Sequence, residues 1–348
     1  MKATPRDLAL LPKAHLHLHL EGSMRPGTLA DLAAAAGIPG PDVRGYRTFA
    51  EFVASYADAV ALVRTESDLR RVVREVVEDA AADGAVWLEP AVNPLAYRGR
   101  LGPPGHVLDL LLDEARTTAD RLGIGCGLMV TAQRHLPPPT AVELAQLAAS
   151  RAGAGVVAFG LAADEQRYAP EPFSRAFATA RDAGLISAPH AGELVGEASI
   201  VGALDALGAD RIGHGIRAAE SPGLMARLAA ESTVLDVCPT SNVSLGLVAT
   251  FADHPLPRLL EAGVRCTIGA DDPLLFGTGL LDEYTAVRDV LGLDDNCLAD
   301  VARWSLEASG APRPAVAAAL RDIGTWRSAP PPDDPPDTPD TSVSEGAP

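Results

Sequence analysis

Short apolar runs with strand character alternate with helical stretches along most of this chain, and this alternation most constrains its fold. Seven runs have strand character: Ala85–Ala91, Ile124–Thr131, Gly155–Leu161, Leu185–His190, Arg211–His214, Val234–Cys238 and Arg265–Ala270. Helical stretches lie between them at His106–Leu122, Ala141–Arg151, Glu171–Ala183, Glu197–Leu207, Gly223–Ala230 and Leu256–Ala262. A strand expected near the N-terminus brings the strands to eight. Strands joined through helices run parallel. Eight such units over roughly 250 residues predict an α/β fold, the (β/α)₈ TIM barrel.

Extra helices are expected after strand 1 and at the C-terminus. Residues 26–36 predict one helix, residues 48–82 predict two more with a break near Thr65, and residues 280–323 predict the closing helices. A doubly wound open sheet has the same alternation, but no G-x-G-x-x-G motif follows the first strand. Residues 1–327 therefore form one predicted domain. Pro, Asp, Ser and Thr dominate residues 328–348, which we expect to be a disordered tail.

Composition and charge narrow the kind of partner. The 348 residues carry a formal net charge of −17, which argues against a nucleic-acid groove because phosphate binding needs a basic surface. No apolar run approaches the length of a membrane-spanning helix, and no signal peptide is recognisable at the N-terminus. The four cysteines are too far apart for a C-x-x-C site. We therefore expect a cytoplasmic protein with reduced thiols and a small-molecule substrate, and the oligomeric state stays open.

Histidine alternates with an apolar residue in the opening strand, at His15, His17 and His19. Because successive side chains of a strand point to opposite faces, the three imidazoles share one side. In a barrel that side can be the enclosed axis, where neutral imidazoles are ready metal ligands. A polar strand whose histidines only hydrogen-bond to protein is the other interpretation.

Further ionisable residues stand where other strands end. His190 and Glu193 follow strand five, His214 follows strand six, and Asp271 and Asp272 follow strand eight. Functional groups of a (β/α)₈ barrel lie at the C-terminal ends of its strands. His214 could be a satisfied buried imidazole and Asp272 a helix cap, but together these residues predict an active site at one barrel mouth.

An aromatic stripe follows helical spacing at Phe49, Phe52 and Tyr56. Such a stripe is usually part of the core. A lining above a bound ligand is the alternative.

Four motifs stand in the chain in a fixed order. They are L-P-K-A-x-L-H-x-H-L-E-G at 11–22, H-A-G-E at 190–193, R-I-G-H-G at 211–215 and D-D-P at 271–273, and C-P-T-S-N at 238–242 fits with them. In order and spacing, from Leu11 to about Gly310, the chain resembles the adenosine/adenine deaminase family of the amidohydrolase superfamily, as a divergent member of bacterial type. The other type of zinc deaminase is excluded because its Pro-Cys-x-x-Cys signature is absent.

The resemblance implies a zinc site with one ion per chain, held by His17, His19, His190 and Asp271. Imidazole and carboxylate ligands with one position left for water suit catalytic zinc. Zinc in such a site lowers the pKa of its water to about 7.

The resemblance also implies the catalytic roles. His214 would orient the water and take part in its deprotonation, and Glu193 would protonate purine N1, which makes C6 electrophilic. Glu193 must then be kept protonated by its surroundings. Asp272 would accept a hydrogen bond from a purine-site nitrogen. Hydroxide adds to C6, and ammonia leaves.

Four positions depart from the family's pattern, one of which is Ala91, where an arginine is usual. His15 stands where Glu or another polar residue is usual, and we expect it to support the ligands rather than to bind the metal. Ala163 replaces a glycine whose backbone N–H meets purine N3, so that the N–H is kept but a methyl group is added and φ is restricted. Glu21 replaces the aspartate that adenosine-specific members direct at the ribose 5′-hydroxyl. Glu21, Ala163 and Asp272 are therefore the candidate substrate-binding residues.

The sequence thus predicts an enzyme that deaminates an aminopurine nucleoside, with adenosine or deoxyadenosine as the first candidates. Adenine, an N6-substituted purine and an aminodeoxyfutalosine-like nucleoside are the alternatives. A two-metal hydrolase would want a carboxylated lysine at the end of strand four, where Ala162, Ala163 and Asp164 stand. A non-catalytic purine-binding relative would be favoured by the loss of a ligand or of Glu193, and neither is lost.

Overall fold

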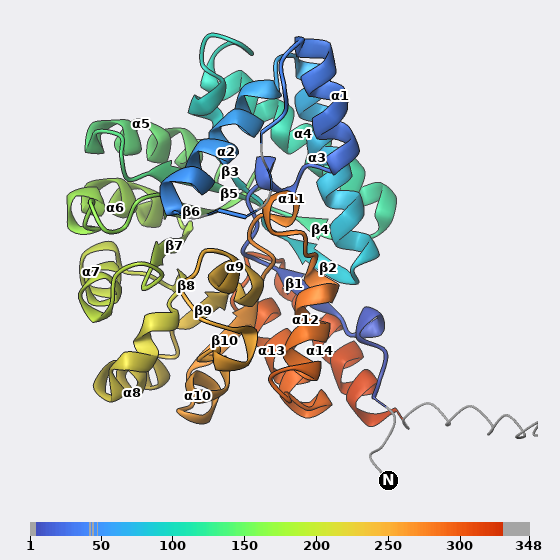
Figure 1. Ribbon diagram of the computed structural model, residues 1–348, viewed down its shortest axis with the longest axis vertical. Coiled ribbons are helices and arrows are strands. Elements are labelled where there is room, and N and C mark those ends of the chain that lie inside the picture. Colours follow the sequence, from blue (N-terminus) through green and yellow to red (C-terminus); the bar gives the residue numbers. More distant parts are fainter. Residues whose placement is uncertain (1–4, 42, 44, 47, 330–348) are drawn as a thin grey trace, which may run out of the picture.

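A ring of parallel strands inside a layer of helices makes up the computed structural model, which describes residues 5–41, 43, 45–46 and 48–329 (Figure 1). The strand segments are β1 (Lys13–His15), β2 (Ala85–Leu88), β3 (Ala91–Val92), β4 (Gly125–Cys126), β5 (Leu128–Gln133), β6 (Val156–Ala162), β7 (Ile186–Ala191), β8 (Arg211–His214), β9 (Val234–Val237) and β10 (Arg265–Ile268). They form eight strands, because β2 with β3 and β4 with β5 are each two parts of one strand. Pairing continues across both breaks, where Gly127 N–H donates to the Leu88 carbonyl and Met129 N–H to the Pro90 carbonyl.

The segment that follows β1 closes the sheet into a barrel. Hydrogen-bonded neighbours run β1-β2-β4 in one sheet and β10-β9-β8-β7-β6-β5-β3 in the other. His19 N–H donates to the Asp271 carbonyl at 2.9 Å, and Ala91 N–H donates to the Leu18 carbonyl at 2.7 Å. The first strand therefore pairs with the last strand on one side and with the second on the other. The predicted (β/α)₈ barrel is confirmed.

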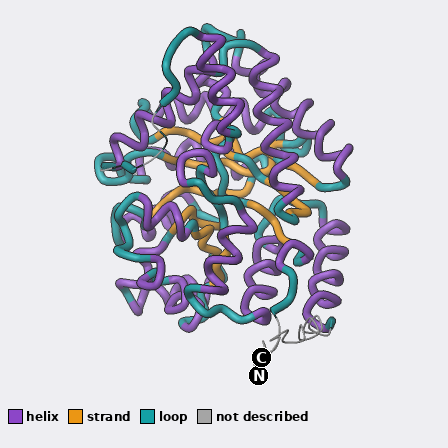
Figure 2. The backbone as a smooth tube through the Cα atoms, turned by 45° about the vertical axis from the view of Figure 1, so that its right-hand side comes forward, coloured by secondary structure: helices purple, strands orange, loops and turns teal. Residues whose placement is uncertain are grey.

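Helices cover the strands in both views of the backbone (Figures 1 and 2). They are α1 (Pro26–Ala36), α2 (Phe49–Leu62), α3 (Glu66–Ala82), α4 (Pro104–Leu122), α5 (Pro138–Ala149), α6 (Ser174–Asp182), α7 (Glu197–Leu207), α8 (Pro222–Glu231), α9 (Pro239–Ser244), α10 (Leu256–Glu261), α11 (Pro273–Phe276), α12 (Leu280–Asp289), α13 (Asp295–Glu307) and α14 (Arg313–Ser328). The sequence does not predict α9 and α11. Each is short and begins with a proline immediately after a strand end, where proline suits the first helical turn.

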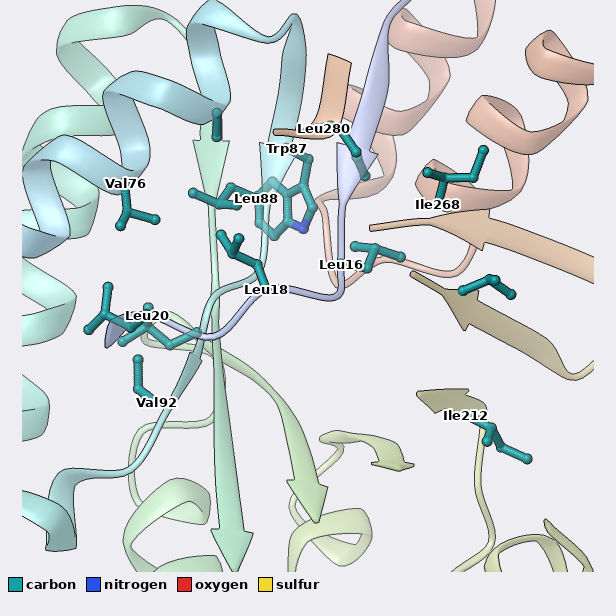
Figure 3. Close-up of a cluster of buried hydrophobic side chains, with 14 of the residues drawn as sticks. Leu16, Leu18, Leu20, Val76, Trp87, Leu88, Val92, Ile212, Ile268 and Leu280 are labelled. Carbon is teal, nitrogen blue, oxygen red and sulfur yellow. The ribbon is translucent and has the colours of Figure 1, made fainter. Parts of the chain in front are cut away.

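The leucines between the histidines fix the register of the first strand. Leu16, Leu18 and Leu20 follow one another along it and are at most 2% exposed (Figure 3). They belong to the main apolar core together with Trp87 and Val76. Burying one leucine contributes about 1.5–3 kcal/mol, and a one-residue slip would exchange the leucine and histidine faces. The leucine face thereby places the imidazoles opposite it.

The C-terminal end of the described chain is α14, which ends at Ser328, the first residue of the expected tail. Residues 330–348 lie outside the described residues, so the tail stays a prediction. Within the described part of the chain, no helix has the length and apolar character needed to cross a membrane.

Candidate active site

The four predicted metal ligands meet at the C-terminal ends of the strands. His190 Nε2 lies 3.0 Å from His17 Nε2 and 3.2 Å from His19 Nε2. Asp271 Oδ1 lies 3.4 Å from His17 Nε2 and 3.3 Å from His19 Nε2. Tetrahedral ligands at about 2.0–2.1 Å from one ion would lie about 3.3–3.4 Å from one another. The spacing therefore fits a single small metal ion.

The hydrogen bond on the far side of His17 supports the same conclusion. Its Nδ1 lies 2.8 Å from the carbonyl oxygen of Asp236, which can only accept, so Nδ1 must carry a proton. In neutral His17 the lone pair of Nε2 then faces His190 and Asp271. Burial lowers the pKa of His17, but the hydrogen bond and charge of Asp271 outweigh burial and raise it. The site thus stabilises a positive charge where a cation would bind.

His15 and Ser241 hold Asp271 from outside the ligand set. His15 Nε2 accepts from the backbone N–H of Ala270 at 3.0 Å, and Ser241 Oγ donates to Asp271 Oδ2 at 2.6 Å. Burial and the neighbouring His17 lower the pKa of His15 to about 3, so its ring is neutral and able to accept. His15 supports the metal-binding strand end, as the sequence predicts.

Glu193 lies in the loop after β7 and is only 6% exposed. Its Oε1 lies 3.7 Å from His214 Nε2. Burial raises the pKa of Glu193 well above its ordinary value, and the charges of Asp271 and Glu165 raise it further. Its surroundings therefore favour the protonated carboxyl group, which is the state that a general acid needs.

A chain of hydrogen bonds fixes the tautomer of His214. Leu256 N–H donates to His254 Nδ1 at 3.2 Å, so His254 Nε2 donates to Asn242 Oδ1 at 3.2 Å. The amide nitrogen of Asn242 then donates to His214 Nδ1 at 3.3 Å. Burial and His17 lower the pKa of His214 to about 3. Neutral His214 thus carries its proton on Nε2, which faces Glu193.

His214 is also close enough to be considered as a ligand. Its ligand atom and those of His17, His190 and Asp271 all lie within 4.8 Å of one another, and His19, Asp271 and Asp272 form a second such group. His214 Nε2, however, lies 3.9 Å from Asp271 Oδ2 and bears the proton that its hydrogen-bond chain leaves there. We therefore keep His19 as the fourth ligand and His214 as a neighbour of the metal.

Asp272 is not a helix cap in this structure. It precedes α11, but its side chain makes no capping hydrogen bond. Both carboxyl oxygens are buried without a hydrogen-bond partner, although the group lines the cavity described below. A Cβ atom on Gly22 would lie 1.6 Å from Asp272 Oδ1, so glycine is required beside it. Burial and the charges of Asp271 and Glu21 raise the pKa of Asp272 well above its ordinary value.

Glu21 has both of its carboxylate oxygens engaged by protein. Tyr56 donates its hydroxyl to Oε2 at 2.6 Å, and Tyr97 donates its hydroxyl to Oε1. Glu21 and Tyr97 are buried, and Tyr56, rather than Glu21, forms part of the cavity wall. The side chain therefore differs from Asp272, which keeps its hydrogen-bonding capacity free.

Ala163 follows the end of β6 with a φ of +80°. This left-handed conformation costs a residue with a side chain about 1–2 kcal/mol. Among the described residues other than glycine, positive φ occurs at Ala163, His214, Ser232 and Asp271. Three of these four lie at the barrel mouth, and backbone strain of this kind concentrates at functional sites.

A cavity of about 420 Å³ opens above the metal-binding atoms, a volume within the range usual for small-molecule sites. Strand-end residues such as His190 and Ala163 form its floor, and α2 contributes Phe49, Phe52 and Tyr56 to its wall. The aromatic stripe thus lines this cavity. Of the two interpretations, core packing and a lining above a ligand, the structure favours the second.

Three residues that shape the site carry no signal in the local pattern: His254, Glu165 and Tyr97. Each acts through a hydrogen bond to a residue distant in sequence, 12, 27 and 76 positions away respectively. Only the packing of the barrel brings these pairs together.

The sequence and the fold of this chain are similar to those of known deaminases and amidohydrolases. The family model described as adenosine deaminase matches residues 12–326. A putative adenosine/adenine deaminase of Streptomyces coelicolor is 46% identical over 336 residues, which cover 92% of this chain and 98% of that protein. The crystal structure of an adenine deaminase from Arthrobacter aurescens aligns with a TM-score of 0.86 and 32% identity over 91% of this chain and 99% of that chain. An amidohydrolase from Burkholderia ambifaria with bound zinc aligns with a TM-score of 0.81 and 26% identity over 92% of each chain.

The closed barrel and the histidine and aspartate cluster at its mouth define a hydrolase of the amidohydrolase type. Within that class, the extent of the family match and the similarity to its relatives are decisive. The chain belongs to the adenosine/adenine deaminase family of hydrolytic deaminases.

Proposed function

We propose that this protein holds one zinc ion and hydrolytically deaminates a 6-aminopurine, the free base adenine. The observation that carries the deaminase proposal is that three imidazoles and a carboxylate, a buried glutamic acid and an aspartic acid without a hydrogen-bond partner meet at one cavity. His17, His19, His190 and Asp271 are the proposed zinc ligands. Zinc bound there would act as a Lewis acid and lower the pKa of a ligated water to about 7.

Glu193 and His214 supply the proton chemistry in this proposal. Glu193 donates its carboxyl proton to ring N1, which makes C6 electrophilic. His214, whose proton is fixed on Nε2 by Asn242, orients the attacking water through that N–H. The water adds its hydroxyl group to C6, and its other proton ends on the amino group. The C6–N bond then breaks and ammonia leaves, and the proton of the C6 hydroxyl returns to Glu193 as the C6 carbonyl forms.

Asp272 and Ala163 hold the base in this proposal. A protonated carboxyl group can donate through one oxygen and accept through the other, so Asp272 can engage a ring nitrogen in either form. Ala163 presents its backbone N–H to ring N3 from the cavity floor. Neither contact requires a sugar.

The environment of Glu21 favours the free base over adenosine, the first substrate that the sequence suggests. A ribose contact would need Glu21 to reach the cavity. Its carboxylate is buried, accepts hydrogen bonds from Tyr56 and Tyr97, and does not line the cavity, whose wall is formed by Tyr56 instead. The adenine deaminase of known structure, with 32% identity to this chain, is consistent with this choice.

Metal analysis and a substrate panel test the proposal. Purified protein should contain close to one zinc ion per chain and release ammonia from adenine faster than from adenosine, deoxyadenosine or aminodeoxyfutalosine. It should also form hypoxanthine from adenine faster than from N6-methyladenine, whose leaving group is methylamine. Two metals per chain would contradict the zinc site. Faster turnover of adenosine would overturn only the free-base assignment, whereas no hydrolysis of any of these compounds at C6 would overturn the deaminase assignment.

A further inference from the structure

The carboxylate of Glu165 is surrounded by backbone N–H groups of the loop that follows β7. Its Oε1 accepts from Gly192 at 2.5 Å. Its Oε2 accepts from Glu193 at 3.1 Å, from Leu194 at 2.7 Å and from Val195 at 3.0 Å. A carboxylate has about four acceptor positions, and four N–H groups converge on this one, three of them on Oε2. The carboxylate of Glu165 is therefore engaged by one segment.

The backbone N–H groups of residues 192–195 depend on Glu165 for a hydrogen-bond acceptor. This segment lies between the end of β7 at Ala191 and the start of α7 at Glu197, and residues 192–194 are buried. Buried N–H groups outside regular structure need an acceptor, because leaving them unpaired is costly. Glu165 is itself only 5% exposed and supplies that acceptor to four consecutive residues.

The strained turn at Ala163 and a buried arginine belong to the same arrangement. β6 ends at Ala162, the left-handed Ala163 reverses the chain direction, and Glu165 follows two residues later. Arg134 donates through Nη2 to the carbonyl of His190 at 2.5 Å and through Nη1 to the carbonyl of Tyr168 at 2.7 Å. Thus Arg134 hydrogen-bonds to the carbonyl of His190, just before the loop of residues 192–195, and Glu165 hydrogen-bonds to the N–H groups within that loop.

We propose that Glu165 is a positioning residue that fixes the loop of residues 192–195 and thereby places the carboxyl group of Glu193 against the substrate ring. The inference rests on the proposed role of Glu193 as the acid. Glu165 touches no reacting atom in this proposal. Its effect passes through the main chain of Glu193.

A double-mutant cycle tests the proposal. In Glu165→Gln the amide group turns an NH₂ toward N–H groups that need an acceptor, so the loop shifts. Misplacement of a reacting group by about 1 Å can cost roughly 10²-fold, and we expect kcat to fall on that scale with KM and zinc content nearly unchanged. In the Glu193→Gln background the same substitution should have no further effect. Losses that multiply in the double variant would overturn the proposal.

Asp164→Asn is the matched control. Asp164 adjoins Glu165. Its carboxylate accepts a hydrogen bond from the backbone N–H of the exposed Arg167 at 3.1 Å. We expect wild-type kcat from this variant. A loss equal to that of Glu165→Gln would show a general effect of altering this loop and would contradict the specific role.

Hydrogen exchange gives a readout that does not depend on turnover. In the wild-type protein the amides of residues 192–195 should be protected although they lie outside helices and strands, and in Glu165→Gln they alone should lose protection. Unprotected amides in the wild type would overturn the proposal even if the variant failed to fold. An inactive wild type with protected amides would contradict the proposed function and leave the loop contact intact.

Discussion

Shortening Glu21 by one methylene, in Glu21→Asp, tests whether this carboxylate belongs to the structure of the barrel mouth or contacts the substrate. In the structure the Glu21 carboxylate accepts hydrogen bonds from the hydroxyls of Tyr56 and Tyr97. The aspartate carboxylate would lie about 1.5 Å closer to the backbone, one carbon–carbon bond length. It cannot reach both tyrosines without a shift of α2, so we expect one of the two hydrogen bonds to be lost.

The size of the effect follows from that loss. A hydrogen bond to a charged group contributes about 1.5–3 kcal/mol. Unfolding entropy is about 2.1 cal/mol/K per residue, or about 0.7 kcal/mol/K for a domain of roughly 320 residues. The melting temperature of Glu21→Asp should therefore fall by about 2–4 °C. Adenine turnover should change little, because in this account Glu21 does not touch the base.

Thermal unfolding of the zinc-loaded protein, followed by circular dichroism, measures the first effect, and ammonia release from adenine measures the second. Tyr97→Phe removes the same hydrogen bond from the other side and should lower the melting temperature similarly. Tyr168→Phe removes the hydroxyl of a residue that is 37% exposed and should leave it unchanged. An unchanged melting temperature together with a large loss of adenine turnover would refute the reasoning, since an unpaired group built for a substrate partner discriminates by about 10⁴-fold or more.

Three further variants test separate parts of the site. Glu193→Gln should keep its zinc and its fold but lose about 10²–10⁴-fold in kcat; turnover near wild type would show that another group is the acid. Ala163→Gly relieves about 1–2 kcal/mol of backbone strain against about 0.5–1 kcal/mol of added chain entropy, so thermal unfolding should show equal or slightly higher stability, and a clear drop would contradict the strain. Burial raises the pKa of Glu283 to about 8, so the native state holds a proton that the unfolded chain releases between pH 4.5 and 8. Stability should fall across that window by about 1 kcal/mol per pH unit, and denaturant titrations of Glu283→Gln should show a flatter pH dependence; identical curves would contradict the shift.

The barrel could be predicted because it follows from short-range patterns, whereas the ligand set is implied by the resemblance to the family. The strand–helix alternation fixes the topology, and the period of two in the first strand fixes which side the histidines share. Seven of the eight strands begin and end within two residues of their predicted positions. The first is shorter than predicted, because β1 ends at His15 and only isolated bridges at Leu18 and His19 continue its pairing. His17, His190 and Asp271 then meet because parallel strands of a barrel end at one mouth.

The surroundings of the site could not be predicted, because they depend on pairs that only the closed barrel brings together. Asp272 has the sequence position of a helix cap, and only its missing hydrogen bonds show that it is free for a ligand. Glu21 has the sequence position of a substrate contact, and only the two tyrosines show that it is engaged. The packing leaves Asp272 available for the substrate contact that the resemblance implies, and it withdraws Glu21 from the cavity wall.

Two of the departures from the family's pattern, Glu21 and Ala163, therefore have different consequences. At position 21 the longer glutamate side chain reaches Tyr56 and Tyr97 and accepts their hydroxyl hydrogen bonds, so it is engaged by protein rather than by the substrate. Ala163 keeps the backbone conformation that a glycine would adopt freely, and it does so at a cost in strain. That conformation leads the chain to Glu165, whose four hydrogen bonds hold the loop that carries Glu193. A left-handed alanine can persist here because the chain beyond it is fixed at both ends, by β6 and by the loop after β7. The floor of the cavity and the placement of the acid are thus parts of one turn, and a change at position 163 acts on both.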